Sequence, residues 1–193
     1  MASQGYGEEE LLANRASVLV SGGTEEERRT WASAAARNFF HEGLLTEVRQ
    51  NEQLGDVLRK PRGVVFIPDV ARLSAAAQIL IVRCLQTQEE RPKLVVGLSG
   101  PVEQARGKGT LREDLLYRLH RAHVDLSAEG MRERMVQRRA QLVADEAQRR
   151  VEAERLAAEK AAQLKASGIS IRGARLQSKA LPRATSAKVT TRR

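Results

Sequence analysis

The chain has 193 residues, which is enough for one sizeable hydrophobic core with extensions. Only 3% of the residues are aromatic, so the core must be aliphatic, and the single cysteine, Cys84, excludes an intrachain disulfide. The sequence contains no long apolar run or signal-like segment, which predicts a cytoplasmic protein that does not insert into membranes.

The first predicted element is a buried strand at 18–20, followed by the turn Ser21-Gly22-Gly23. Thr24 and Glu27 have the spacing of a capping box, in which each side chain bonds to the other residue's backbone N–H. This spacing predicts a helix that continues to about Phe40.

The alternation of short apolar runs and helical stretches continues to residue 126, which predicts an α/β fold with a parallel sheet flanked by helices. The further elements are a weaker strand near 44–48, a short helix near 53–58, a strand at 63–67, a helix capped by Ser74, and strands at 94–98 and 124–126. The predicted organisation is an N-terminal segment at 1–14, a domain at 15–130, a long helix at 131–167 and a tail at 168–193.

The long helix is predicted because residues 131–166 lack Gly and Pro and are rich in Ala, Arg, Glu and Gln. Asp145 and Arg149 have the favourable i,i+4 order of an ion pair. A thin apolar line follows one side: Val136, Ala140, Val143, Ala147 and Val151. This line fits a weak coiled coil or a docking face for a partner. A solvated helix that lies partly on its own domain fits the same pattern.

The end of the chain, residues 169–193, is basic, contains no acidic residue and is predicted to be disordered. Two functions remain open for it: a polyanion-binding segment or a solubilising tail. The candidate polyanion-binding residues are Arg172, Arg175, Lys179, Arg183, Lys188, Arg192 and Arg193.

Two segments resemble a known family. Residues 111–119 read Leu-Arg-Glu-Asp-Leu-Leu-Tyr-Arg-Leu, and residues 63–86 begin with the strand Gly-Val-Val-Phe-Ile-Pro-Asp-Val. Both resemble the AAA+ core of sigma-54-dependent transcription activators, and the resemblance covers about residues 15–134. It implies a P-loop ATPase fold.

The motifs of nucleotide chemistry depart from the pattern of that family. The Walker A position reads Ser21-Gly22-Gly23-Thr24-Glu25-Glu26-Glu27-Arg28, without the lysine that reaches the terminal phosphates. In the Walker B position, Pro68 replaces the metal-holding Asp, and Asp69 stands where the family has Glu. The resemblance therefore implies a pseudo-ATPase with no cofactor and no metal.

Other functional features are few. The loop by which the family contacts sigma-54 is absent between residues 41 and 62. In the family, arginines at the positions of Arg112 and Arg118 reach the ATP site of a neighbouring subunit; here they are either trans-acting groups or members of local ion pairs. His41, His120 and His123 have no metal-ligand spacing, and Ser21, Ser99 and Ser127 have no paired histidine in the pattern of a nucleophile elbow.

These observations predict a non-catalytic cytoplasmic regulatory protein that acts through protein–protein contact as an inhibitor or adaptor. The candidate partners are an AAA+ ATPase or a co-encoded enzyme. The alternative function is a nucleic-acid-associated transcription regulator that binds through the basic tail.

Overall fold

The computed structural model describes residues 7–39, 44–60, 62–87 and 91–166. The chain forms two compact units, one ending at Gln148 and the other beginning at Arg149. The basic residues proposed from the tail, from Arg172 to Arg193, and the predicted end of the long helix at residue 167 lie outside the described residues.

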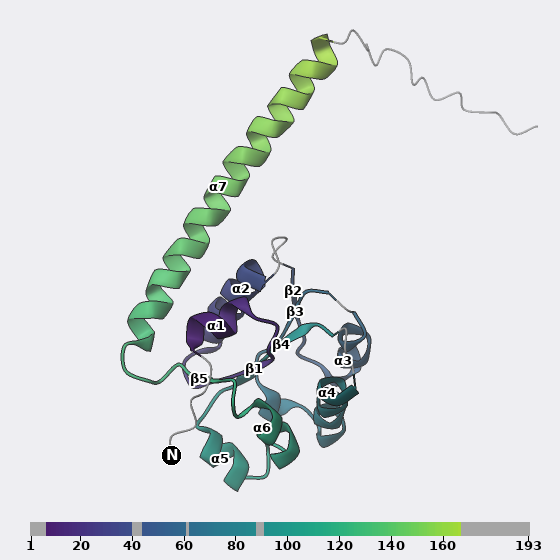
Figure 1. The fold of residues 1–193 in the computed structure, drawn as a ribbon, viewed down its shortest axis with the longest axis vertical. Helices are drawn as coiled ribbons and strands as arrows, with labels where there is room; N and C mark the ends of the chain where they lie inside the picture. The colour runs from purple at the N-terminus through teal and green to yellow at the C-terminus, as the bar shows by residue number, and fades with distance from the viewer. Residues whose placement is uncertain (1–6, 40–43, 61, 88–90, 167–193) are drawn as a thin grey trace, which may run out of the picture. The chain divides into compact units, whose positions relative to one another are not determined.

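A parallel five-stranded sheet forms the centre of the first unit, as the sequence predicts (Figure 1). Its strand order is β2-β3-β4-β1-β5, so β1 lies between β4 and β5 although they follow it late in the chain. The strands are β1 (Val18–Ser21), β2 (Leu45–Glu47), β3 (Val64–Ile67), β4 (Lys93–Leu98) and β5 (His123–Asp125).

Helices cover both faces of this sheet, because the continuous apolar strands point alternate side chains to opposite sides. Val65 and Ile67 of β3 pack with one set of helices, and Val64 and Phe66 pack with the other. The helices on the first face are α3 (Asn51–Leu58), α4 (Ala75–Thr87), α5 (Val102–Gly107) and α6 (Glu113–Leu119), with the 3₁₀ turn Val70–Arg72. Those on the second face are α1 (Glu8–Ala13), α2 (Glu25–Phe39) and the start of α7 (Met131–Ala166).

Helix α1 is an element that the sequence analysis left inside an N-terminal segment. Its Leu11 and Leu12 are buried in the core beside Trp31 of α2. The ammonium group of Lys93, the first residue of β4, is fully buried and donates to the backbone oxygens of Leu11 and Asn14. A cation at these carbonyls stabilises the C-terminal end of the helix.

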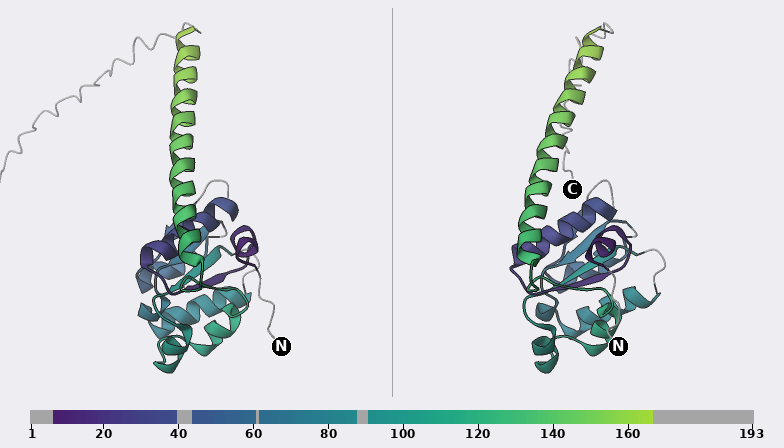
Figure 2. Two further views of the ribbon diagram at one scale, coloured as in Figure 1. Left: turned by 90° about the vertical axis from the view of Figure 1, so that its left-hand side faces the viewer. Right: turned by 60° about the vertical axis from the view of Figure 1, so that its left-hand side comes forward.

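The first half of α7 packs on its own domain, which was one of the two alternatives for this helix. Met131 and Met135 are buried in the core, and the guanidinium of Arg37 in α2 donates to the Leu142 oxygen, 2.9 Å away. In Figures 1 and 2 this part of α7, drawn in green, lies beside α2. Asp145 forms an ion pair with Arg37, at 3.1 Å.

The apolar line on α7 lies outside this contact. At about 100° per residue, Val136 and Val143 lie about 100° around the helix axis from Met135 and Leu142. Val136 is 65% exposed and Val143 is 63% exposed. In the second unit, the described residues 149–166 continue the helix, and Val151 is also exposed. No helix within the described ranges combines the length and apolar character needed to cross a bilayer.

Candidate functional site

The carboxyl ends of β1, β3 and β4 meet at one edge of the sheet. The strand order reverses around β1 at this edge, and such an edge is where open α/β sheets bind ligands. The turn after β1 is tied to β4, because the Gly22 N–H donates to the Leu98 oxygen at 3.1 Å. Gly22 and Gly23 have φ values of 71° and 59°, a left-handed conformation that glycine adopts without strain.

The capping box predicted at the start of α2 is confirmed. The Thr24 N–H donates to the Glu27 carboxylate at 2.7 Å, and the Glu27 N–H donates to the Thr24 hydroxyl at 3.2 Å. Helix α2 consequently begins at Glu25, directly after the turn. The chain's own side chains therefore satisfy backbone donors that a phosphate-binding loop directs at its ligand.

Arg28 links this turn to the end of β3. Its guanidinium is 3% exposed and donates to three backbone oxygens: Gly22 at 2.9 Å, Gly23 at 2.8 Å and Pro68 at 3.1 Å. Burial lowers the pKa of Arg28, and the nearby carboxylate of Asp69 opposes this change. The structure thus brings the Walker A positions 22–24 and the Walker B positions 68–69 together around an arginine.

Asp69, the remaining carboxylate at the end of β3, already has partners. Its side chain accepts from the Ala71 N–H at 3.1 Å and lies 3.6 Å from the guanidinium of Arg72. The Pro68 carbonyl is packed closely against β4: a Cβ atom placed on Gly97 would lie 2.3 Å from the Pro68 oxygen. The Pro68 carbonyl thus lies in the contact between the ends of β3 and β4, whereas Asp69 caps the turn that follows β3.

One serine has a histidine partner that the sequence analysis did not identify. The hydroxyl of Ser21 lies 2.7 Å from Nε2 of His123 on the edge strand β5. Desolvation lowers the pKa of His123, while Asp125 and Glu103 act in the opposite direction. The two residues are 102 positions apart, and only the pairing of β1 with β5 brings them together. Ser21 is buried, so the contact joins two strands rather than presenting a nucleophile to substrate.

The two candidate trans-acting arginines have local partners. Arg112 precedes α6 and binds the Asp114 carboxylate through two hydrogen bonds of 3.0 and 2.8 Å. This contact raises the pKa of Arg112 and lowers that of Asp114. With the Gln86 amide oriented so that its oxygen faces Arg118, the two groups are 2.7 Å apart.

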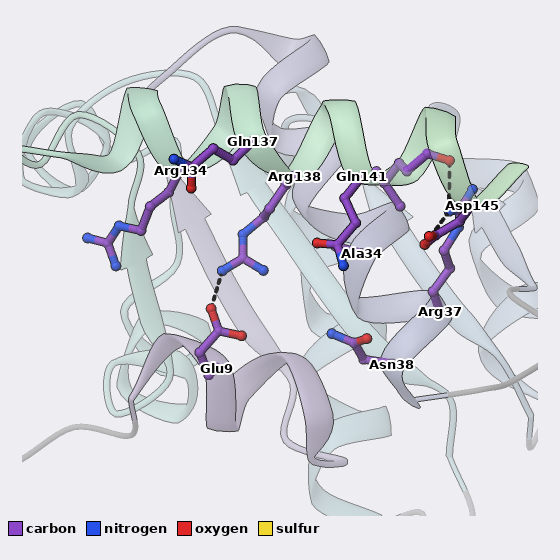
Figure 3. A pocket seen from close by; sticks show the side chains of 10 residues that line it. Glu9, Ala34, Arg37, Asn38, Arg134, Gln137, Arg138, Gln141 and Asp145 are labelled. Atoms are coloured by element: carbon purple, nitrogen blue, oxygen red, sulfur yellow. Dashed lines mark hydrogen bonds and ion pairs between the residues drawn. The ribbon is translucent and has the colours of Figure 1, made fainter.

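A second concave surface, of about 480 Å³, lies between α1, α2 and the first half of α7 (Figure 3). Its charged lining is paired internally. Arg138 contacts Glu9 at 2.6 Å, and Arg37 contacts Asp145. The residues around it are Glu9, Ala34, Arg37, Asn38, Arg134, Gln137, Arg138, Gln141, Leu142 and Asp145. These ion pairs explain how α7 attaches, and they leave little net charge for a ligand.

Two solved structures with this fold belong to bacterial proteins. NtrX from Brucella abortus, solved in complex with ATP, has 19% sequence identity and a TM-score of 0.50 over 61% of this chain. The P-loop NTPase domain of a sigma-54 transport activator from E. coli has 21% identity and a TM-score of 0.50, also over 61% of this chain. The matched region is 33% of the NtrX chain and 87% of the E. coli domain.

These similarities establish a P-loop NTPase-like fold for the chain. The protein spans about a third of the NtrX chain. No protein-family model and no curated protein matches the sequence. The fold agrees with the resemblance inferred from residues 63–86 and 111–119. The fold alone does not show whether the residues at the Walker A and Walker B positions bind a nucleotide.

Proposed function

We propose that this protein is a regulatory protein that binds another protein and does not hydrolyse ATP. The observation that carries the proposal is the buried Arg28 guanidinium. It donates to the backbone oxygens of Gly22, Gly23 and Pro68 at the edge where a P-loop NTPase binds its nucleotide. A phosphate would have to displace these bonds before the loop could wrap around it.

The negative charge at the start of α2 also opposes the binding of a nucleotide. Glu25, Glu26 and Glu27 form the first turn of α2, and the Glu27 carboxylate already occupies the Thr24 N–H. At 4 Å and an effective dielectric constant of 20, two like charges repel by about 4 kcal/mol. A polyphosphate at this helix start would face such repulsion without the lysine that offsets it in a P-loop.

The metal-binding strand lacks the group that would hold magnesium. Nucleotide hydrolases place a carboxylate there to hold Mg²⁺ and a water-positioning group beside it. Here the first position is Pro68, whose side chain has no ligand atom. The Asp69 carboxylate bonds to the Ala71 N–H and lies beside Arg72. This arrangement supports a domain that uses the fold as a scaffold.

We propose the apolar line of α7 as the partner-binding face. Val136 and Val143 are exposed outside the intramolecular contact of the helix, with Ala140 and Ala147 along the same line. A partner helix with a matching apolar stripe would pack there. The protein would then act as an inhibitor or adaptor of its partner, for which an AAA+ ATPase or a co-encoded enzyme is the candidate class.

Calorimetric titration of the full chain with MgATP and MgADP, together with an assay of phosphate release, tests whether the protein binds or hydrolyses nucleotide. We expect no heat of binding up to 1 mM nucleotide and no phosphate release. A dissociation constant below 1 mM, or turnover above a nucleotide-only blank, would contradict it.

Affinity purification from the native cells tests the interaction part. The tagged protein is compared with the double variant Val136→Glu/Val143→Glu and with the control Gln137→Glu/Gln148→Glu. The control adds the same charge at exposed positions off the apolar line. We expect one stoichiometric protein that survives nuclease treatment with the wild type and the control and is lost with the valine variant. Equal recovery with all three would overturn the role of α7.

A further inference from the structure

Another groove, of about 490 Å³ and separate from the one beside α7, lies at the opposite end of the strands from the Arg28 site. It is bordered by Ser17, which precedes β1, by Ala122, which precedes β5, and by the end of α6. Its size is within the range of ligand-binding clefts. The groove is independent of the nucleotide-like edge and of the proposed α7 face.

The groove is basic. Arg91, Arg118 and Arg121 line it together with His120, and no carboxylate is present among its described lining residues. Arg118 and Arg121 are exposed. Such a concentration of one charge in a concave surface focuses the electrostatic field and attracts anions. This contrasts with the groove beside α7, where Arg37 and Arg138 are paired with carboxylates.

The Arg91 guanidinium is positioned by a neutral hydroxyl group. It donates to the Ser17 hydroxyl at 3.2 Å, and the Arg91 carbonyl accepts from the guanidinium of Arg15 at 3.1 Å. Arg91 is only half-buried, so part of it reaches the groove. An arginine fixed by a hydroxyl keeps its charge available, and its planar fork suits a phosphate group.

An aromatic ring stands in the same groove. Tyr117 is 76% exposed, the largest exposure of a described aromatic side chain. Its ring stacks with that of His120, with centroids 5.5 Å apart and planes inclined by 29°. The ring is therefore largely accessible to a planar ligand that stacks on it.

We infer that this groove binds single-stranded nucleic acid, with the arginines contacting phosphates and Tyr117 stacking on a base. Single-strand sites combine these two features: a positive groove along the backbone and an aromatic platform for unpaired bases. An acidic protein segment would match the charge but would not use the ring. This nucleic-acid site belongs to the folded domain and not to the basic tail.

Fluorescence anisotropy with labelled 20-mers of dT and U tests the inference on the full chain. The variant Arg118→Glu/Arg121→Glu is compared with Arg59→Glu/Arg155→Glu, which makes the same charge change at exposed positions elsewhere. We expect at least tenfold weaker binding in the groove variant than in this control. The slope of log K against log[salt] should decrease by about 1.4, because each lost single-strand phosphate contact contributes about 0.7.

Tyr117→Ala and Tyr117→Phe separate stacking from charge. We expect about fivefold weaker binding or more for alanine and wild-type binding for phenylalanine, because loss of one stacked base costs at least this factor. Circular dichroism confirms that each variant is folded. Equal binding by the two arginine variants, no effect of Tyr117→Ala, or displacement of the oligonucleotide by poly-L-glutamate at equal charge would each overturn the inference.

Discussion

The Nε atom of Arg28 donates a hydrogen bond to the carbonyl oxygen of Pro68, 3.1 Å away, and so joins the first turns of α2 to the end of β3. The same guanidinium also binds the oxygens of Gly22 and Gly23. A side chain that bridges the two halves of a P-loop-like edge makes that edge part of the folded core. Its removal should therefore affect stability.

We predict that Arg28→Ala lowers the free energy of unfolding by about 2–4 kcal/mol, because three buried or partly buried oxygens lose a charged donor. Arg28→Lys should cost less, since one ammonium group can retain part of these bonds, and it should not bring ATP binding while the Glu27 cap persists. Urea unfolding and MgATP calorimetry measure the two effects.

The control variant for Arg28→Ala is Arg59→Ala, at an exposed position, which should change stability by less than about 0.5 kcal/mol. Equal stability of Arg28→Ala and Arg59→Ala would contradict the bridging role.

We predict opposite effects for two glycine substitutions. In Gly97→Ala the new Cβ would lie 2.3 Å from the Pro68 oxygen and 2.8 Å from the Ile67 oxygen, so β3 and β4 must separate. Such overpacking costs about 1–3 kcal/mol. Gly55→Ala in α3 meets no atom within 4 Å and should stabilise the helix by about 0.5–1 kcal/mol. Thermal unfolding of both variants measures the difference, and a neutral Gly97→Ala would show that the strands separate at little cost.

The sequence predicted the sheet well because each strand is marked by local chemistry. The run at 63–67 is apolar throughout, as expected for a strand buried on both faces, and the Thr24–Glu27 pair marks the start of a helix. These signals require only neighbouring residues. The order of the strands agrees with the fold implied by the family resemblance.

The features that were missed depend on long-range contacts. Helix α1 is short and carries three glutamates, so Leu11 and Leu12 give a weak apolar signal until α2 covers them. Ser21 and His123 become neighbours only through the sheet. The Arg28 contact was missed because nothing in the neighbouring sequence indicates that this side chain points inward to backbone oxygens.

We predict that Arg138 contributes more to stability than its neighbour Arg139. Arg138 contacts Glu8 at 2.9 Å, both side chains are largely buried, and Glu8 also accepts from Nε1 of Trp31. Arg138→Ala should cost about 2–3 kcal/mol, because it leaves a buried carboxylate with fewer partners. Arg139 pairs with Glu26 at an exposed site, and Arg139→Ala should cost at most about 0.5 kcal/mol. Fluorescence of Trp31, the single tryptophan, reports urea unfolding of both variants. Equal costs would show that the α1–α7 contact is weak.

We predict that Lys93 makes stability depend on pH in the alkaline range. Burial lowers the pKa of Lys93 from 10.5 to about 8, so the native state releases this proton near pH 8 and the unfolded state near pH 10.5. Between these values the unfolded state binds more protons, and the free energy of unfolding rises with pH by up to about 3 kcal/mol from this group. Below pH 8 the lysine is charged in both states and adds no slope.

The variant Lys93→Met isolates this contribution, because methionine retains much of the buried volume without a titrating group. Burial also raises the pKa of Cys84, which lowers stability with rising pH, but this effect is common to both proteins and cancels in the difference. We therefore expect the wild type to gain stability relative to Lys93→Met between pH 8 and pH 10.5 in urea unfolding, and the exposed Lys108→Met to follow the wild type. Parallel curves for wild type and Lys93→Met would mean that the Leu11 and Asn14 oxygens keep the ammonium protonated across this range.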